Sequence, residues 1–236
     1  MQRITAIILS SRGVGEFDRL YAMYSREAGL VRAVGRGVRR PAAKLAGHLE
    51  PLTLSEIHIA RSRGRGQIAS AITLENFENI KKSFENTSKI LRIFRFFLKI
   101  FGEEEKDERT FDLLREFLEN LDGLGYEGDR AGVLSEAFWW KIFDLLGRRP
   151  EVARCLKCSA RPSGKEENFF SAEEGGIICG KCGRNGNGLS RITANQIKLL
   201  RIFLANTLPK ILKVKIDSGE LEGLVRIRKD FERYNF

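Results

Sequence analysis

The sequence lacks any long apolar run, which excludes a membrane-spanning helix. Its most apolar segment, residues 90–101, is interrupted by Arg92, Arg95 and Lys99, whereas a span needs about 20 consecutive apolar residues. The first residues form too short an apolar run for a signal peptide and show no small-residue cleavage site. We therefore expect an intracellular, cytoplasmic protein without a membrane partner.

Catalytic signatures are also scarce. The chain has 2 histidines. It contains no phosphate-binding loop ending in Gly-Lys-Ser/Thr, no Gly-x-Ser-x-Gly and no His-Glu-x-x-His. Acidic clusters such as residues 103–105 do not show the spacing of a Mg²⁺ site. We predict a protein that is not an enzyme, and a zinc-stabilised nuclease or transferase is the enzyme class left open.

Proline is rare, at 5 of 236 residues, while 42% of the chain is hydrophobic and 31% is charged. This composition excludes a disordered, collagen-like or low-complexity protein. The length suits one large domain or two small ones with a real hydrophobic core.

Positive charge is in excess and lies mainly at the two ends of the chain. The net charge is +10 and the pI is near 9.6. Residues 1–75 carry a net +6, residues 76–182 a net −2, and residues 183–236 a net +6. This pattern favours a nucleic-acid partner. The C-terminal excess is either a second nucleic-acid surface or a solvated helix face.

The first 75 residues show the pattern of a small β-barrel. Short apolar runs at 4–10, 20–25, 30–35, 52–60 and 67–74 are separated by glycine and charged residues. Five strands at this spacing are typical of an OB-type barrel.

From about residue 77 the apolar period becomes helical. Apolar residues recur at i, i+3 and i+4 over residues 83–101. Further helices are predicted at 111–121, 134–146, 193–208 and 220–234.

We therefore predict an α+β protein with two domains. A five-stranded OB-type barrel, the candidate nucleic-acid-binding domain, is expected over residues 1–78. An α-helical domain is expected over residues 79–236, and it carries a four-cysteine zinc module at 153–184.

All 4 cysteines fall in one short region. They form two Cys-x-x-Cys pairs, Cys155 with Cys158 and Cys179 with Cys182, which is the arrangement of a tetrathiolate zinc site. We expect one structural Zn²⁺, because four thiolates leave no open position for water or substrate. Gly180 is expected to supply backbone freedom for the second pair, as is Gly183. An iron–sulfur cluster, a pair of disulfides and a redox pair are the alternatives.

Basic residues of the barrel region are the candidate nucleic-acid contacts. Residues 36–44 carry turn residues and four cations, so we expect an exposed, mobile connection there. A second group alternates with glycine and serine in the sequence. The predicted nucleic-acid-binding residues are Arg12, Arg36, Arg39, Arg40, Lys44, Arg61, Arg63 and Arg65.

Aromatic residues are few in the same region. Residues 1–76 contain only Phe17, Tyr21 and Tyr24, and we interpret the two tyrosines as core residues of a strand. Single-strand binders usually stack bases on several exposed rings. Binding here is therefore expected to rest on phosphates, with a slope of log K against log salt of about −3 to −6.

Several motifs, in this order along the chain, resemble the RecO family of bacterial recombination mediators. They are Gly15-Glu-Phe-Asp18, Arg26-Glu-Ala-Gly29, Gly35-Arg-Gly-Val-Arg-Arg-Pro41, Leu45-Ala-Gly-His-Leu-Glu-Pro51, and Phe138 to Gly147 with Pro150 leading into Cys155 and Cys158.

The resemblance implies an N-terminal OB fold, a helical C-terminal domain and a four-cysteine zinc module. It implies a role in the RecF pathway, in which members bind single- and double-stranded DNA and anneal complementary strands. Its implied partners are RecR, single-strand-binding protein (SSB) and possibly RecA, which members load onto SSB-coated DNA. A cytoplasmic, nucleoid-associated protein follows from that role. The alternative is an RNA-binding or ribosome-associated zinc protein, since a basic OB barrel suits RNA as well.

Overall fold

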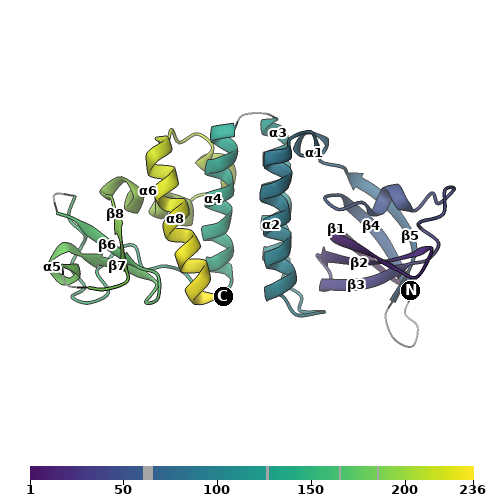
Figure 1. Cartoon of the computed structure of the whole chain (residues 1–236), viewed down its shortest axis with the longest axis horizontal. Coiled ribbons are helices and arrows are strands. Elements are labelled where there is room, and N and C mark those ends of the chain that lie inside the picture. Colours follow the sequence, from purple (N-terminus) through teal and green to yellow (C-terminus); the bar gives the residue numbers. More distant parts are fainter. Residues whose placement is uncertain (61–65, 126–127, 165, 185) are drawn as a thin grey trace. The chain divides into compact units, whose positions relative to one another are not determined.

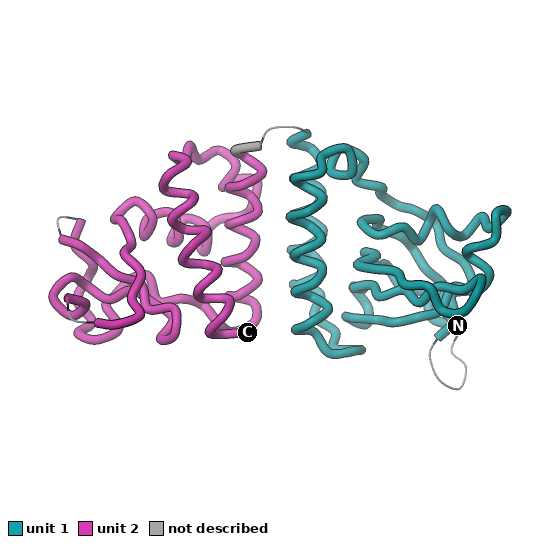
Figure 2. The backbone as a smooth tube through the Cα atoms, in the orientation of Figure 1, with its two compact units in different colours: residues 1–126 teal, residues 127–236 magenta. Residues whose placement is uncertain are grey.

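The computed structural model describes residues 1–60, 66–125, 128–164, 166–184 and 186–236. The chain divides into two compact units, Met1–Tyr126 and Glu127–Phe236 (Figure 2). Each unit combines a β-structure with helices (Figure 1).

The first unit begins with a closed five-stranded barrel. Its strands are β1 (Gln2–Val14), β2 (Asp18–Ser25), β3 (Gly29–Gly35), β4 (Leu54–Ala60) and β5 (Gly66–Glu75), and a 3-10 turn η1 (Ala46–Leu49) lies between β3 and β4. The strand order is β1-β2-β3-β5-β4, and β4 pairs with β1 to close the barrel. All pairs are antiparallel except β3 with β5. This is the predicted OB-type topology.

Alternating apolar residues explain the barrel core. Ile4, Ala6 and Ile8 of β1 point inward and pack with Ile57 and Ile59 of β4, as the two-residue period of a strand requires. Strand β2 is buried more completely, and Leu20 to Ser25 are all inaccessible. Its second face is covered by helical residues of the same unit.

Helices α1 (Glu78–Lys82), α2 (Phe84–Ile100) and α3 (Glu108–Leu124) complete the first unit. The ring of Tyr24 in β2 lies 5.1 Å from that of Phe97 and 5.0 Å from that of Phe101. Burial raises the pKa of the Tyr24 hydroxyl. The α2–α3 connection is bonded to strand β3, because the Glu104 backbone N–H donates to the Leu30 carbonyl oxygen at 3.0 Å. These contacts tie the helices to the barrel.

The second unit is built around α4 (Gly128–Leu145), which is buried on most of its surface. Helices α6 (Ala194–Ala205), α7 (Leu208–Ile211) and α8 (Ser218–Asn235) pack against it. The core contains one buried ion pair, in which Arg228 Nε donates to Glu136 Oε2 at 3.0 Å. Glu136 Oε1 accepts from Trp140 Nε1 at 3.0 Å, so both carboxylate oxygens have partners.

A small lobe carries the cysteines. It contains β6 (Asn168–Ser171), β7 (Gly176–Cys179), the short helix α5 (Gly180–Gly183) and β8 (Leu189–Ile192). The sheet order is β7-β6-β8, and both pairs are antiparallel. One face packs on the helices, where the ring of Phe170 lies 6.1 Å from those of Trp140 and Phe231.

The predicted fold class is confirmed, with a barrel followed by helices and a cysteine lobe. The prediction did not include α1, α5, α7 or β8. The two compact units divide at residue 126, whereas the predicted domains divide at residue 78. The domain boundary at residue 78 stays a prediction. Within the described part of the chain, no helix combines the length and apolar character needed to cross a bilayer.

Candidate metal centre and nucleic-acid interface

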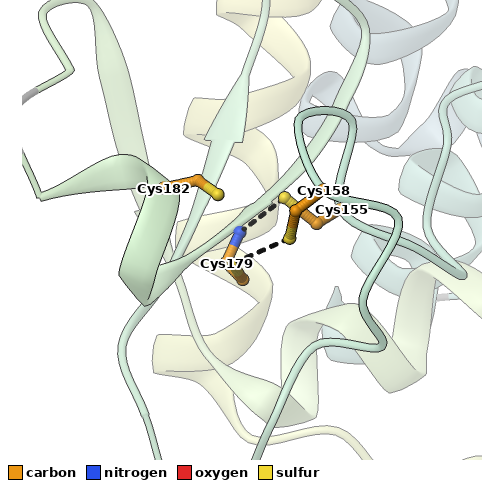
Figure 3. Close-up of side chains that lie close together, drawn as sticks. All are labelled: Cys155, Cys158, Cys179 and Cys182. Carbon is orange, nitrogen blue, oxygen red and sulfur yellow. Dashed lines mark hydrogen bonds between the residues drawn. The ribbon is translucent and has the colours of Figure 1, made fainter.

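The four cysteines meet at one point (Figure 3). All four sulfurs, of Cys155, Cys158, Cys179 and Cys182, lie within 4.8 Å of one another. The Sγ atoms of Cys158 and Cys179 are 3.7 Å apart. Cys155 and Cys179 are buried, whereas the other two are reached by solvent.

A tight turn after α4 positions the first pair. The Cys155 backbone N–H donates to the Ala160 carbonyl oxygen at 2.8 Å, and the Ser159 N–H donates to the Cys155 carbonyl oxygen at 2.8 Å. Ser159 adopts a positive φ of 59°. The Leu156 N–H donates to the Ile177 carbonyl oxygen at 2.9 Å, which joins this turn to β7.

The second pair follows directly from β7, which ends at Cys179, and from α5. Two glycines flank Cys182's turn, and the structure corrects the reason expected for them. Neither Gly180 nor Gly183 has a positive φ, so backbone freedom is not what the site requires. A Cβ on Gly180 would collide with the Glu167 carbonyl oxygen, and a Cβ on Gly183 would collide with the Phe169 ring. Close approach is therefore the physical requirement.

Two of the thiols have pKa values that are shifted in opposite directions. Burial raises the pKa of the Cys155 thiol, but backbone N–H groups of Cys179, Cys158 and Lys157 lower it more, to about 6. The Cys179 N–H lies 3.3 Å from the Cys155 sulfur. Conversely, the neighbouring sulfurs of Cys158 and Cys179 raise the pKa of Cys182 to about 12. Four sulfurs this close cannot all carry charge without a cation between them.

The arrangement fits a tetrahedral metal ion. With four Zn–S bonds of about 2.3 Å, the sulfurs of a tetrahedron stand about 3.8 Å apart, close to the 3.7 Å found between Cys158 and Cys179. A divalent cation would also favour the deprotonated form of all four thiols. The four cysteines thus form a possible metal site with a complete ligand set.

The candidate nucleic-acid surface is formed where two parts of the barrel meet. We call residues 12–18 the hairpin tip, because they contain the end of β1 and the turn to β2. Residues 36–44, after β3, form the basic loop. Three hydrogen bonds join the two: Gly37 N–H to Asp18 Oδ1 at 2.8 Å, Arg39 N–H to the Phe17 carbonyl oxygen at 3.0 Å, and Arg39 Nη1 to the Gly15 carbonyl oxygen at 3.3 Å. The first half of the loop is therefore anchored, whereas the sequence predicted a mobile connection.

A cation–π contact adds to this junction. The guanidinium carbon of Arg40 lies 5.1 Å from the centroid of the Phe17 ring. Five of the predicted DNA contacts lie in described residues, and all five are exposed. They belong to the hairpin tip or to the basic loop: Arg12, Arg36, Arg39, Arg40 and Lys44.

Comparison with known proteins identifies the family. The model "Recombination protein O N terminal" matches residues 1–77, and "Recombination protein O C terminal" matches residues 81–234. The chain belongs to the RecO family.

Several RecO relatives align over nearly the whole chain. A "DNA repair protein RecO" of Dehalococcoides mccartyi strain 195 is 30% identical over 224 residues, which cover 94% of this chain and 86% of the relative. Proteins of the same name from Pelotomaculum thermopropionicum and Alkaliphilus metalliredigens are 29% and 24% identical, and cover 98% and 97% of this chain. The two alignments cover 83% and 93% of the lengths of those relatives. The chain is thus a DNA repair protein of the RecO family.

The predicted site residues of this RecO protein have different outcomes. The four cysteines are brought together, and the first basic group lies at one junction. The second basic group, Arg61, Arg63 and Arg65, lies outside the described residues, so its role stays a prediction. Tyr21 and Tyr24 are buried, as interpreted from the sequence.

One exposed residue of the candidate nucleic-acid surface is not among the residues predicted from the sequence. Phe17 is 39% exposed at the hairpin tip. Its position between Gly15 and Asp18, in a turn that interrupts an apolar pattern, was the available signal. Its contact with Arg40, 23 positions away in the sequence, had no local signal.

Proposed function

We propose that this RecO protein is a DNA-binding mediator of the RecF repair pathway and not an enzyme. In this role it binds single- and double-stranded DNA, anneals complementary strands, and with RecR helps to load RecA on DNA coated by SSB. Family membership supports the DNA repair role, and the basic junction of the barrel supports DNA binding.

One observation carries the DNA-binding part of the proposal. The basic loop is held against the hairpin tip by backbone hydrogen bonds, so its cations stand on a fixed support. Fixed cations lose less conformational freedom when they bind phosphates than cations on a free loop would. Arg39 is the best placed of them, because its backbone and its side chain both contact the hairpin tip.

Phosphate contact suits strand annealing physically. Cations that neutralise backbone phosphates reduce the repulsion between two strands, and they leave the Watson–Crick edges free to pair. A surface with a single exposed ring suits this better than a platform that engages every base. Arg12, Arg36, Arg39, Arg40 and Lys44 are the proposed contacts in the described residues, and Arg61, Arg63 and Arg65 remain further candidates from the sequence.

The cysteine centre is proposed to hold one structural Zn²⁺ through Cys155, Cys158, Cys179 and Cys182. When bound, the ion supplies cross-linking of the lobe and no open coordination position. The chain's own residues orient the ligands, since the backbone N–H of Cys179 points to the sulfur of Cys155. A structural role predicts that the metal supports the fold of the lobe and takes no part in DNA contact.

The partners named for this function are RecR, SSB and RecA, and the expected location is the cytoplasm, in association with the nucleoid. These assignments follow from the family role.

Annealing of complementary labelled oligonucleotides, both coated with SSB, tests the proposal. We expect this protein to accelerate annealing at low salt and to lose the effect at high salt. Annealing at the uncatalysed rate at low salt would contradict the mediator role. Competition between DNA and RNA strands of equal length decides the alternative, because an RNA-binding protein would prefer the RNA strand.

A further inference from the structure

The hairpin tip presents an exposed aromatic ring among cations. Phe17 is 39% exposed and neighbouring Val14 is 43% exposed, although both are apolar. The other two aromatic residues of the barrel, Tyr21 and Tyr24, are 1% and 0% exposed. Phe17 is therefore the one phenylalanine, tyrosine or tryptophan ring of residues 1–60 that a ligand can reach.

The ring is held in place from two sides. The backbone carbonyl oxygen of Phe17 accepts a hydrogen bond from the Arg39 N–H at 3.0 Å. Its face lies under the Arg40 guanidinium, whose carbon is 5.1 Å from the ring centroid. The ring is thus fixed beside the same arginines that are proposed to hold phosphates.

An aromatic face next to phosphate-binding cations is the combination that recognises an unpaired nucleotide. Every base has a π face that can stack on such a ring, whereas the bases inside a duplex have both faces covered by their neighbours. Arginine adds to this, because its planar guanidinium also stacks on bases and rings.

We propose that Phe17 and Arg40 form a stacking site for one unpaired DNA base, which gives this protein a preference for single-stranded over double-stranded DNA. The inference rests on the proposed DNA binding and deepens it. The arginines and Lys44 hold the phosphates of either form, while the Phe17 ring distinguishes them. One stacked base per protein leaves the neighbouring bases free to pair.

The experiment compares two oligonucleotides that differ only in their bases. Oligo-dT and an abasic strand of equal length carry the same phosphates, so their affinity ratio isolates the contribution of base contacts. Binding is measured by fluorescence anisotropy for the wild-type chain and for Phe17→Ala, Phe17→Leu and Phe17→Tyr. Phe84→Ala is the matched control, because Phe84 at the start of α2 is 89% exposed and lies outside the basic junction.

We expect Phe17→Ala to weaken oligo-dT binding about 5- to 100-fold and to leave abasic binding nearly unchanged. Phe17→Leu should behave in the same way, whereas Phe17→Tyr should retain the base preference. Phe84→Ala should have no effect on either strand. The slope of log K against log salt should stay the same in Phe17→Ala, because no phosphate contact is removed.

Two other outcomes overturn the inference, and they differ from each other. If Phe17→Ala weakens both strands by the same factor, the ring only supports the Arg40 side chain, and DNA binding itself still stands. If Phe17→Ala leaves both affinities unchanged, the ring has no role. Failure of the wild-type chain to bind either strand at low salt would instead overturn the proposed DNA binding and this site with it.

Discussion

The barrel of the first unit and the small sheet of the second are both built mainly from antiparallel pairs, yet the clusters of buried residues packed against them differ in size and in kind. The barrel encloses 12 mutually packed buried residues, including Ile8, Met23 and Ile57. Around the candidate metal site of the lobe, the cluster of packed buried side chains in the described residues is smaller and includes two of the cysteines: it consists of Cys155, Ile178 and Cys179. The barrel has a hydrophobic interior, whereas the lobe has sulfur ligands in the corresponding place.

Closure accounts for part of this difference. The barrel pairs β4 with both β1 and β5, so its sheet has no long free edge. The lobe has three strands of four residues each, near the lower limit for an independently stable sheet. One face of that sheet is supported by helices through Phe170, and the other depends on the cysteines. Stability should therefore be intrinsic in the barrel and metal-dependent in the lobe.

Removal of the metal should have the largest effect, and only on the lobe. Structural zinc sites contribute on the order of 10 kcal/mol of binding free energy to the folded state. A strong chelator, or Cys179→Ser, should greatly accelerate amide hydrogen exchange in β6, β7 and β8. Exchange in the barrel strands should stay unchanged, and added Zn²⁺ should restore protection after chelation. Unchanged exchange in the lobe, with metal loss verified by elemental analysis, would contradict a structural ion.

The helices beneath the lobe depend on a different polar contact. Arg228 and Glu136 form an ion pair with side chains 4% and 3% exposed. Glu136→Gln should lower the free energy of unfolding of the second unit by about 3–5 kcal/mol, because it leaves the Arg228 charge buried and incompletely paired. Urea denaturation measures this loss.

Glu167→Gln is the control for that substitution. Its partner is Arg191 at 3.3 Å, and the two side chains are 62% and 79% exposed. Such an exposed pair contributes about 0–1 kcal/mol. Equal losses from the two substitutions would show that burial does not set the strength of the Glu136 contact.

The sequence predicts the elements of this fold where local periodicity decides them. The run predicted as a helix at 83–101 is α2, and the five predicted strands are the five strands of the barrel. The metal site was predictable for the same reason, because each Cys-x-x-Cys turn is local and only the meeting of two turns is not.

Other features depend on contacts that leave no periodic trace. Strand β8 has four residues of mixed polarity, and its pairing with β6 determines it. The grouping of α1 to α3 with the barrel rests on contacts such as Glu104 with Leu30, 74 positions apart. The junction of the hairpin tip and the basic loop uses backbone carbonyls, which every residue has. The sequence composition could identify the arginines as candidate contacts, but it could not show the hydrogen bonds that hold the loop carrying them.

The packing of the α2–α3 connection against the barrel can be tested by substituting a glycine. Gly29 has φ +66°, and a Cβ there would collide with the Glu105 carbonyl oxygen of the α2–α3 connection. Gly15 has nearly the same φ, +67°, but has open space around it. Gly15→Ala should cost only the backbone strain, about 1 kcal/mol. Gly29→Ala should cost about 2–4 kcal/mol in thermal or urea unfolding, because overpacking adds to that strain. Similar losses would indicate that the connection moves freely away from β3.

The smallest expected effect is on binding and not on folding. Arg39→Ala/Arg40→Ala should weaken DNA binding by about 1–3 kcal/mol and make the salt slope less steep by about 2. The matched control is Arg95→Ala on α2, an exposed arginine that is not among the predicted contacts. Titrations of labelled DNA at several salt concentrations measure both quantities.

The same DNA titration shows whether the barrel or the cysteine lobe contacts DNA. If the barrel alone binds DNA, chelated protein should bind as the intact protein does, while Arg39→Ala/Arg40→Ala should lose affinity with the lobe still protected from exchange. Loss of DNA binding on chelation, with the barrel still protected, would assign the metal lobe a direct part in DNA contact. An unchanged double variant would remove the basic loop from the binding surface, because two exposed arginines on a fixed support cannot contact phosphates without contributing to the salt slope.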